Sequence, residues 1–544
     1  MRTAVARVAD SLGKLGLPCP VAELATRDWD VVIVGAGHNG LTAAAYLARA
    51  RRSVLVLEQR ERVGGACTLE QPFSDDRYVV SPCAYVAGLL DPLVINELGL
   101  MERGVSIRTA DPTLFVPFDD GAAFVEWADD DRTVAGMRDL GISATDIQGF
   151  CDYRERFDRC RRLLRKGERD GWVGDSPSRA QIEELLGGER ELIDILFEAS
   201  IADVLDEHVD DQRVKDALYG QGLIAAWGGP RTPGTAAIHL MHHMGELGDE
   251  PGLWGYVQGG MGMISFAIAD AALEAGTQIA CGVAVRAIVP GEGVELEDGT
   301  RIRAHAVLSN ADPKVALRLL EGTGIPGRFA ARLEDWKVRS PVLKLNAAMS
   351  ELPRWTAAAG EAWPAAGTVN CRESLDDAQA AFEACERGEL RIAFTELYSQ
   401  TAGDATVAPP NRHVISVFCQ YAPDAPLATW DAGLREEAAG QIFALIDRFA
   451  PGFREHVLEH EVLAPPDIEE RIGLSGGNIF QGECFPDQMW EGRLQSRTPV
   501  EGLYFCGAAT HPGGSVIGLN GRNAAMAVLE DAGYTPSSRV GTTP

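Results

Sequence analysis

Three glycines and one glutamate near the N-terminus have the residue types and spacing of a dinucleotide-binding site. Gly35, Gly37 and Gly40 form a G-x-G-x-x-G pattern, and Glu58 follows roughly twenty residues later, where an acid can bind a ribose. The first glycine permits a tight turn, the second lets backbone approach a pyrophosphate, and the third allows a helix to pack closely on a strand. We therefore predict a dinucleotide site built on these residues.

The segments around these residues have the character of a strand, a helix and a second strand. Residues 31–34 form a short β-branched run, which is typical of a buried parallel strand. Residues 41–50 are rich in Ala and Leu and favour a helix, and residues 53–57 form a second apolar run that Glu58 closes. The free N–H groups where the helix begins, near His38 and Asn39, are predicted to bind the phosphates.

Charged residues and glycines extend the pattern beyond Glu58 into E-x-R-x-R-x-G-G, which includes Arg62. This stretch resembles the second phosphate-binding loop of FAD enzymes in the amine oxidase and phytoene desaturase superfamily. The resemblance implies that the acid binds the adenosine ribose and that the arginine and glycines lie along the diphosphate. A solvated loop is the alternative for the arginines. The cofactor-binding residues implied here are Glu58, Gln59, Arg60, Gly64, Gly65 and Ala66.

The composition narrows the functional class. The chain has 544 residues and a net charge of −29, which argues against nucleic acid as a partner because such binding needs a basic face. General adhesion to an anionic membrane is also disfavoured, although a local basic or apolar patch can still make peripheral contact. No run approaches the ~18 apolar residues of a spanning helix. We expect a cytoplasmic protein, with peripheral membrane association or mitochondrial import as open alternatives.

The cysteines indicate a reducing compartment rather than a redox-active pair. The 11 cysteines are odd in number and scattered along the chain. No C-x-x-C or C-x-x-x-x-C occurs, and Cys67 and Cys83 are too far apart in sequence to form such a motif. We therefore do not expect the chemistry of a flavin disulfide reductase.

A second glycine-rich motif lies near the C-terminus. Residues 503–528 read LYFCGAATHPGGSVIGLNGRNAAMAV, a predicted strand, a glycine-rich loop and a helix that begins at about Leu519. The dipole of such a helix can stabilise an anionic reduced flavin. The lack of bulk at Gly513 and Gly514 would let a ring lie close to the backbone.

These motifs together resemble the phytoene desaturase and carotenoid isomerase family of flavoproteins. The branch it is most similar to is that of the pyridine nucleotide-disulfide oxidoreductase domain-containing proteins. The similarity runs from about residue 29 to residue 529 and includes GAGHNG, ERVGGAC, GYVQGGMG, LSNADP and GGNIFQGE. Ser515 stands where many relatives have another glycine. The family implies FAD as cofactor and adds these binding residues: Val285, Asn310, Gly507, Ala508, Gly513, Gly514, Gly518 and Leu519.

The predicted fold is α/β, an FAD-binding Rossmann-like domain of the amine oxidase and phytoene desaturase type with an inserted α+β substrate domain. We expect an N-terminal extension at 1–27, the FAD domain at 28–102, 255–320 and 470–544, and the substrate domain at 103–254 and 321–469. Residues 279–289 are predicted to form one strand. Residues 294–296 and 301–304 should form a hairpin around an Asp-Gly turn, followed by a separate strand at 306–309. Residues 114–116 and 123–127 should pair, and Ser178 with Gln181 should cap a helix over 179–186.

We expect an FAD-dependent enzyme that dehydrogenates or isomerises an apolar, unsaturated substrate by hydride transfer to flavin N5. The apolar, Gly- and Met-rich stretch 222–264 would form one wall of a lipophilic tunnel. His511 is the best candidate for a catalytic side chain, with a structural loop histidine as the alternative. The competing functions are an amine or amino-acid oxidase that uses dioxygen, and a flavoprotein with a structural or interaction role. We expect a lipophilic small molecule as the partner, and the oligomeric state is open between a monomer and a homodimer.

Two further patterns resemble functional sites but lack the residues that would complete them. His239, His242 and His243 have the spacing to share a helical face, but no carboxylate or cysteine cluster completes a metal site, so no metal is expected. Residues 473–477 match G-x-S-x-G. That hydrolase motif needs a buried strand before it and a helix after it, and the charged residues that precede it do not form one.

Overall fold

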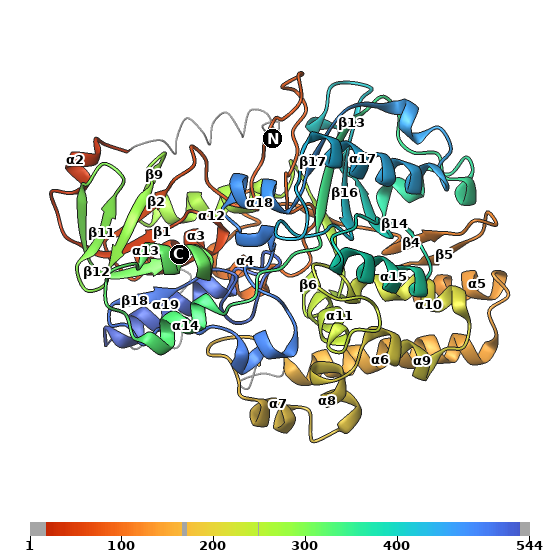
Figure 1. The fold of residues 1–544 in the computed structure, drawn as a ribbon, viewed down its shortest axis with the longest axis horizontal. Coiled ribbons are helices and arrows are strands. Elements are labelled where there is room, and N and C mark those ends of the chain that lie inside the picture. The colour runs from red at the N-terminus through yellow and green to blue at the C-terminus, as the bar shows by residue number, and fades with distance from the viewer. Residues whose placement is uncertain (1–17, 166–170, 248–249, 534–544) are drawn as a thin grey trace.

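The computed structural model describes residues 18–165, 171–247 and 250–533. This part of the chain is built around two large sheets that lie side by side, with helices on their outer faces (Figure 1). The N-terminal strands form part of the first sheet, and the C-terminal helix packs beside it. The middle of the chain supplies most strands of the second sheet. Segments distant in sequence therefore meet where the two sheets adjoin.

The first sheet has the order β10-β11-β12-β1-β2-β9, with β18 paired to the other side of β12. The central strands are parallel, and β10 and β11 add an antiparallel hairpin at one edge. Their buried residues are mostly branched aliphatic side chains, as expected for strands covered on both faces. The strands are β1 (Trp29–Val34), β2 (Val54–Glu58), β9 (Gln278–Cys281), β10 (Val285–Val289), β11 (Gly293–Leu296), β12 (Arg301–Ser309) and β18 (Leu503–Phe505).

Three helices cover one face of this sheet. Helix α3 (His38–Arg49) crosses from β1 to β2, and its alanines allow close contact with α12 (Gly262–Glu274) and α19 (Leu519–Asp531). The remaining helices on this side of the molecule are α2 (Val21–Leu24), α4 (Pro92–Leu98), α13 (Pro313–Leu319), α14 (Gly327–Glu334) and α18 (Pro465–Ile472).

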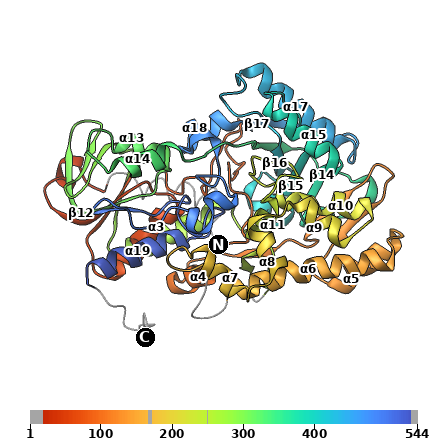
Figure 2. The same ribbon diagram turned by 60° about the horizontal axis from the view of Figure 1, so that its bottom comes forward.

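The second sheet has the order β17-β13-β16-β15-β14-β4-β5. Helix α17 (Ala432–Asp447) packs on one face, and the helices α6 (Ala144–Leu164), α9 (Ile201–His208) and α11 (Thr235–His243) lie on the other side (Figure 2). The strands are β4 (Leu114–Pro117), β5 (Ala123–Glu126), β13 (Leu343–Met349), β14 (Val369–Arg372), β15 (Phe394–Ser399), β16 (His413–Gln420) and β17 (Val457–Leu463).

Helices form a layer beside the second sheet. Two short antiparallel pairs accompany it, β3 (Ile107–Thr109) with β8 (Gly255–Val257) and β6 (Glu246–Leu247) with β7 (Glu250–Pro251). The helices are α5 (Asp130–Asp139), α6 (Ala144–Leu164), α7 (Arg179–Leu185), α8 (Arg190–Phe197), α9 (Ile201–His208), α10 (Gln212–Leu218), α11 (Thr235–His243), α15 (Leu375–Glu386), α16 (Gln400–Gly403) and the 3₁₀ turn η2 (Tyr219–Gly222). None of the helices among the described residues is long and apolar enough to cross a bilayer.

The local predictions were mostly confirmed, with two corrections. The hairpin of β4 and β5 and the capping box of Ser178 and Gln181 are present. The single strand predicted for 279–289 was wrong, because the backbone turns at Gly282 and splits it into β9 and β10, which pair with different neighbours. The separate strand at 306–309 was also wrong. It is the second half of β12, whose first half pairs with β11 and whose second half pairs with β1.

Candidate functional site

Two helix N-termini converge at the carboxyl edge of the first sheet. Helix α3 begins at His38 and α19 at Leu519, and neither start has a side-chain cap. Gly521, in the first turn of α19, lies directly against the carbonyl of Asn39, and a Cβ there would collide with that oxygen. Because free N–H groups and the helix dipole favour negative charge, this pair of helix starts forms a site suited to a pyrophosphate.

The first glycine turn is closed by the side chain of Asn310, the residue that follows β12. Gly35 has φ +100°, a conformation that favours glycine, and its carbonyl accepts a hydrogen bond from Asn310 Nδ2 at 3.3 Å. A Cβ at Gly37 would lie 2.7 Å from the same Asn310 nitrogen, and a Cβ at Gly40 would collide with the Gly35 carbonyl. The structure thus brings the predicted glycines and Asn310 together.

Glu58 ends β2 beside this turn and is almost fully buried. Its carboxylate accepts hydrogen bonds from the N–H of Ala36 at 2.8 Å and of Arg60 at 2.9 Å. Burial raises the pKa of Glu58, and the two backbone donors oppose that shift. A carboxylate has about four acceptor positions, so Glu58 can still accept from a sugar hydroxyl. The backbone N–H of Val283 donates to the Glu58 carbonyl at 2.8 Å, while Val285 lies further along in β10, partly buried.

The second glycine loop packs directly on the first. The N–H of Gly64 donates to the carbonyl of Ala36 at 2.8 Å, and a Cβ at Gly65 would lie 3.3 Å from the Gly37 Cα. Arg60 donates to the Gly65 carbonyl at 3.4 Å and forms an ion pair with Glu70. Arg60 therefore stabilises the conformation of this loop. Gln59 is exposed, whereas Ala66 is partly buried and its carbonyl accepts from the N–H of Ala84 at 3.2 Å.

The C-terminal loop is held on the opposite side of the same edge. Asn520 Nδ2 donates to the carbonyls of Thr510 at 2.9 Å and Gly513 at 3.0 Å, which fixes the loop against the start of α19. Gly507 lies against the carbonyl of Asn310, and a Cβ added to this glycine would be 2.9 Å from that oxygen. The Phe480 side chain fills the space beside Gly514. The remaining predicted residues of this loop are Ala508, whose carbonyl accepts from Arg493, and Gly518, the N-cap of α19.

Several buried polar atoms at this edge have no hydrogen-bond partner among the residues that the structure describes. They include His38 Nε2, Asn39 Oδ1 and Ser309 Oγ. Burial lowers the pKa of His38 to about 4, so its imidazole is neutral at pH 7. Unpartnered buried polar atoms are costly and are expected where a ligand completes the bonding. The residues present therefore fit a bound dinucleotide such as FAD.

His511 is fully enclosed in the C-terminal loop. Its ring lies between Trp172 and Trp490, with centroids 6.2 Å away in each case. Burial lowers the pKa of His511 to about 3, and Nε2 has no hydrogen-bond partner within the described ranges of the chain. A neutral imidazole can accept or donate a hydrogen bond, but its catalytic role stays a prediction.

Helix α11 separates the C-terminal loop from a large cavity. On one side of the helix, Met241 approaches Gly513: a Cβ added to this glycine would lie 3.9 Å from Met241 Sδ. His239 and His243 on the other side stack at 4.2 Å and line the cavity, while His242 packs near Phe480. Within the described ranges, no group of three or more His, Cys, Asp or Glu side chains is placed to hold a metal ion.

The G-x-S-x-G stretch forms no nucleophile elbow. Helix α18 precedes it, where that motif needs a strand. Ser475 lies in a 3₁₀ turn, and its hydroxyl donates to Asp312 at 3.0 Å. Ser475 is therefore a structural residue that holds this turn to the start of α13.

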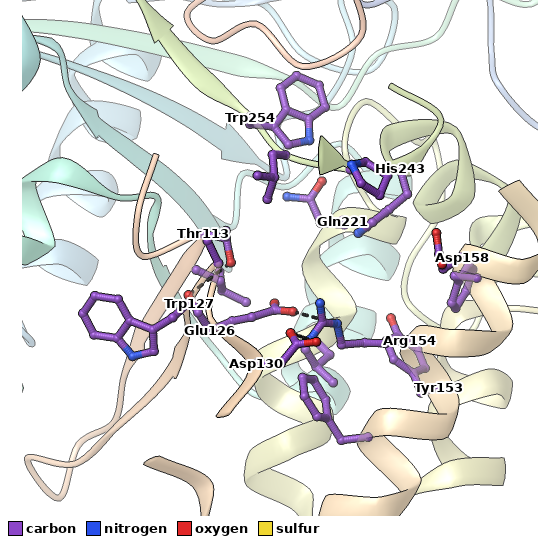
Figure 3. A pocket seen from close by; sticks show the side chains of 18 of the residues that line it. Thr113, Glu126, Trp127, Asp130, Tyr153, Arg154, Asp158, Gln221, His243 and Trp254 are labelled. Carbon is purple, nitrogen blue, oxygen red and sulfur yellow. Dashed lines mark hydrogen bonds and ion pairs between the residues drawn. The ribbon is translucent and has the colours of Figure 1, made fainter. Parts of the chain in front are cut away.

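The cavity has a volume of about 790 Å³ and lies between α6, α11 and the second sheet (Figure 3). Its buried walls are apolar and include Leu114, Phe150, Phe157 and Leu218. Exposed carboxylates mark the mouth, and Arg154 projects between Glu126 and Asp130, with which it forms ion pairs. Trp254 of the predicted 222–264 wall closes one side.

Sequence reasoning missed a polar face on the second sheet. Lys344 on β13 is 2% exposed, and its Nζ lies 4.3 Å from the ring centre of Tyr85 but has no hydrogen-bond partner in the part of the chain that the structure describes. Burial lowers the pKa of Lys344 to about 7. Burial also raises the pKa of Glu396 on β15 to about 7. The signal was present on β13, where polar and apolar residues alternate in LKLN, which indicates a strand with one polar face.

Comparisons with known proteins agree with this geometry. Residues 33–88 match the family model of the NAD(P)-binding Rossmann-like domain. The pyridine nucleotide-disulfide oxidoreductase domain-containing protein 2 of Mus musculus is 34% identical, over 94% of this chain and 97% of that protein. The lycopene-forming phytoene desaturase of Pantoea ananas is 24% identical, over 92% of this chain and 99% of that protein.

The fold has a solved counterpart in an engineered putrescine oxidase, with a TM-score of 0.61 and 18% identity, over 93% of this chain and 99% of that one. This likeness shows the α/β Rossmann fold with a second mixed sheet. The match to the mouse protein extends over nearly the whole of both chains. The chain thus belongs to the family of pyridine nucleotide-disulfide oxidoreductase domain-containing protein 2, a phytoene desaturase-like family.

Proposed function

We propose that this protein is an FAD-dependent oxidoreductase that dehydrogenates or isomerises a largely apolar, unsaturated substrate. The observation that carries the proposal is the pairing of a dinucleotide site at the edge of the first sheet with an apolar-walled cavity across α11. FAD, when bound, would supply the hydride-accepting centre. The segments 28–102, 255–320 and 470–544 would form its domain, and 103–254 with 321–469 the substrate domain.

The roles of the chain's own residues follow from their positions. The N–H groups at the starts of α3 and α19 would bind the diphosphate, and Glu58 the ribose. The aliphatic and aromatic walls of the cavity would bind the substrate and exclude water. Lys344, on the polar face beside Tyr85, would hold or release a proton near neutral pH, because burial lowers its pKa to about 7.

The test is anaerobic mixing of the purified flavoprotein with apolar alkenes and with short amines, following the flavin absorbance. Bleaching by an unsaturated lipophilic compound supports the proposal. Bleaching by short amines alone would overturn it.

One observation favours an amine oxidase as the second candidate. Exposed carboxylates at the cavity mouth, Asp111, Asp130, Glu155 and Glu250, would attract a cationic substrate. Release of hydrogen peroxide when putrescine or benzylamine is added in air is the outcome that this candidate requires.

A further inference from the structure

The inner end of the cavity carries polar atoms that the protein leaves without partners. Gln221 Oε1, Arg372 Nε and His239 Nδ1 make no hydrogen bond within the described chain, and all three residues line the cavity. Arg372 is 6% exposed and His239 5%. Figure 3 shows Gln221 and His243 facing the cavity below Trp254. Because the surrounding walls are apolar, these atoms are the specific recognition points at this end.

The amide of Gln221 is fixed by a buried carboxyl. Gln221 Nε2 donates to Glu396 Oε1 at 2.9 Å, and the hydroxyl of Tyr398 donates to the other oxygen at 3.2 Å. Glu396 is 1% exposed. Since the amide nitrogen must face Glu396, the amide oxygen is the atom left to accept a bond from a ligand.

The guanidinium of Arg372 is fixed by three hydrogen bonds that do not involve Gln221. Its Nη1 donates to the carbonyls of Ala217 at 2.9 Å and Asp216 at 3.3 Å, and Nη2 donates to Asn370. Gly220, the neighbour of Gln221, lies so close that a Cβ would be 2.8 Å from Nη1. Gly220 therefore lets η2, and with it Gln221, pack on Arg372, whose Nε is the guanidinium nitrogen without a hydrogen-bond partner among the described residues.

Beside the ring nitrogen of His239, this end of the cavity presents one acceptor, Gln221 Oε1, and one donor, Arg372 Nε–H, and such a pair is complementary to a hydroxyl group. A carboxylate would face the free oxygen of Gln221 and the carboxyl behind it, and an ammonium would face the guanidinium of Arg372. A pure hydrocarbon would leave both protein atoms unpartnered, which costs binding free energy.

We propose that the cavity binds apolar alcohols, whose hydroxyl donates to Gln221 Oε1 and accepts from Arg372 Nε. This substrate class rests on the proposed function, in which the cavity holds the substrate. Glu396 acts here as a positioning residue, because it reaches the ligand only through Gln221.

The experiment compares ligands that share a chain but differ in the polar group. Purified full-length protein is titrated with 1-octanol, its isomer 1-methoxyheptane, octanoate and octylamine, with calorimetry as the measurement. We expect 1-octanol to bind at least about tenfold more tightly than the ether, which accepts but cannot donate. Equal affinity of the ether, or tighter binding of octanoate or octylamine, would overturn the proposal.

Two variants test whether the preference for 1-octanol over the ether depends on Gln221. Gln221→Met keeps the length of the side chain and should abolish the preference for 1-octanol over the ether, while Gln148→Met, on the exposed face of α6, should keep it. If Gln221→Met does not fold, Glu396→Gln replaces it. That variant should reduce the preference several-fold, because the amide of Gln221 can then turn either way.

The binding preference separates this inference from the proposed function. A preference for 1-octanol that depends on Gln221, in a protein whose flavin no alkene or alcohol reduces, leaves the site standing and removes the proposed function. Flavin bleaching by alkenes without any preference among the four octyl and heptyl probes removes the inference alone.

Discussion

The two faces of the second sheet differ in what they bury. On one face, Leu345, Ala347 and Val417 pack against the apolar side of α17. On the other face, Lys344, Glu396 and other polar side chains are equally buried, and several of their atoms lack partners. Since the same strands supply both faces, the difference cannot come from backbone propensity. The apolar face stabilises the fold, and the polar face is retained at a cost in stability, as expected for a functional surface.

The largest effect should come from the apolar face. Leu345→Ala removes a fully buried side chain from the cluster with α17 and should lower the free energy of unfolding by about 2–5 kcal/mol. Urea denaturation followed by circular dichroism measures the change. Leu458→Ala, at a leucine that is 49% exposed, is the matched control and should change little.

The neighbouring residue on the polar face should respond in the opposite direction. Lys344→Met replaces a buried amine that has no hydrogen-bond partner with an apolar chain of similar length and should raise the free energy of unfolding by about 1–3 kcal/mol. Substrate-dependent flavin reduction should slow by about 10²-fold, in the range of a positioned acid–base group. A variant that is less stable, or equally active, would contradict the functional reading of this face.

A smaller effect should appear in the pH dependence of stability. Burial lowers the pKa of Lys344 to about 7 in the folded protein, against about 10.4 in an unfolded chain. Between these values the unfolded chain binds more protons, so the folded state gains stability as the pH rises. The stability advantage of Lys344→Met should therefore shrink from pH 7 to pH 10. An advantage that stays constant over this range would show that Lys344 does not titrate as described.

The sequence alone was sufficient to predict those parts of the dinucleotide site whose residues lie close together in the chain. The glycine turns, Glu58 and the helix starts lie within short segments whose spacing dictates their contacts, and the structure brings them together with Asn310. The break between β9 and β10 and the continuous β12 were missed because strand pairing across the sheet decided them. The polar face was missed for a similar reason. Lys344 and Glu396 come from separate strands, and only the register of the sheet places them on one face.

The most direct test of the central claim is the amount of FAD that the purified chain carries. The protein is incubated with FAD, separated from free cofactor, denatured, and its flavin measured per chain. We predict about one FAD per chain for the wild type. Gly37→Val, which places a branched side chain where a Cβ already lies 2.7 Å from Asn310 Nδ2, should retain little. A folded wild type without flavin, or equal flavin content in the two proteins, would contradict the claim that this edge of the sheet binds FAD.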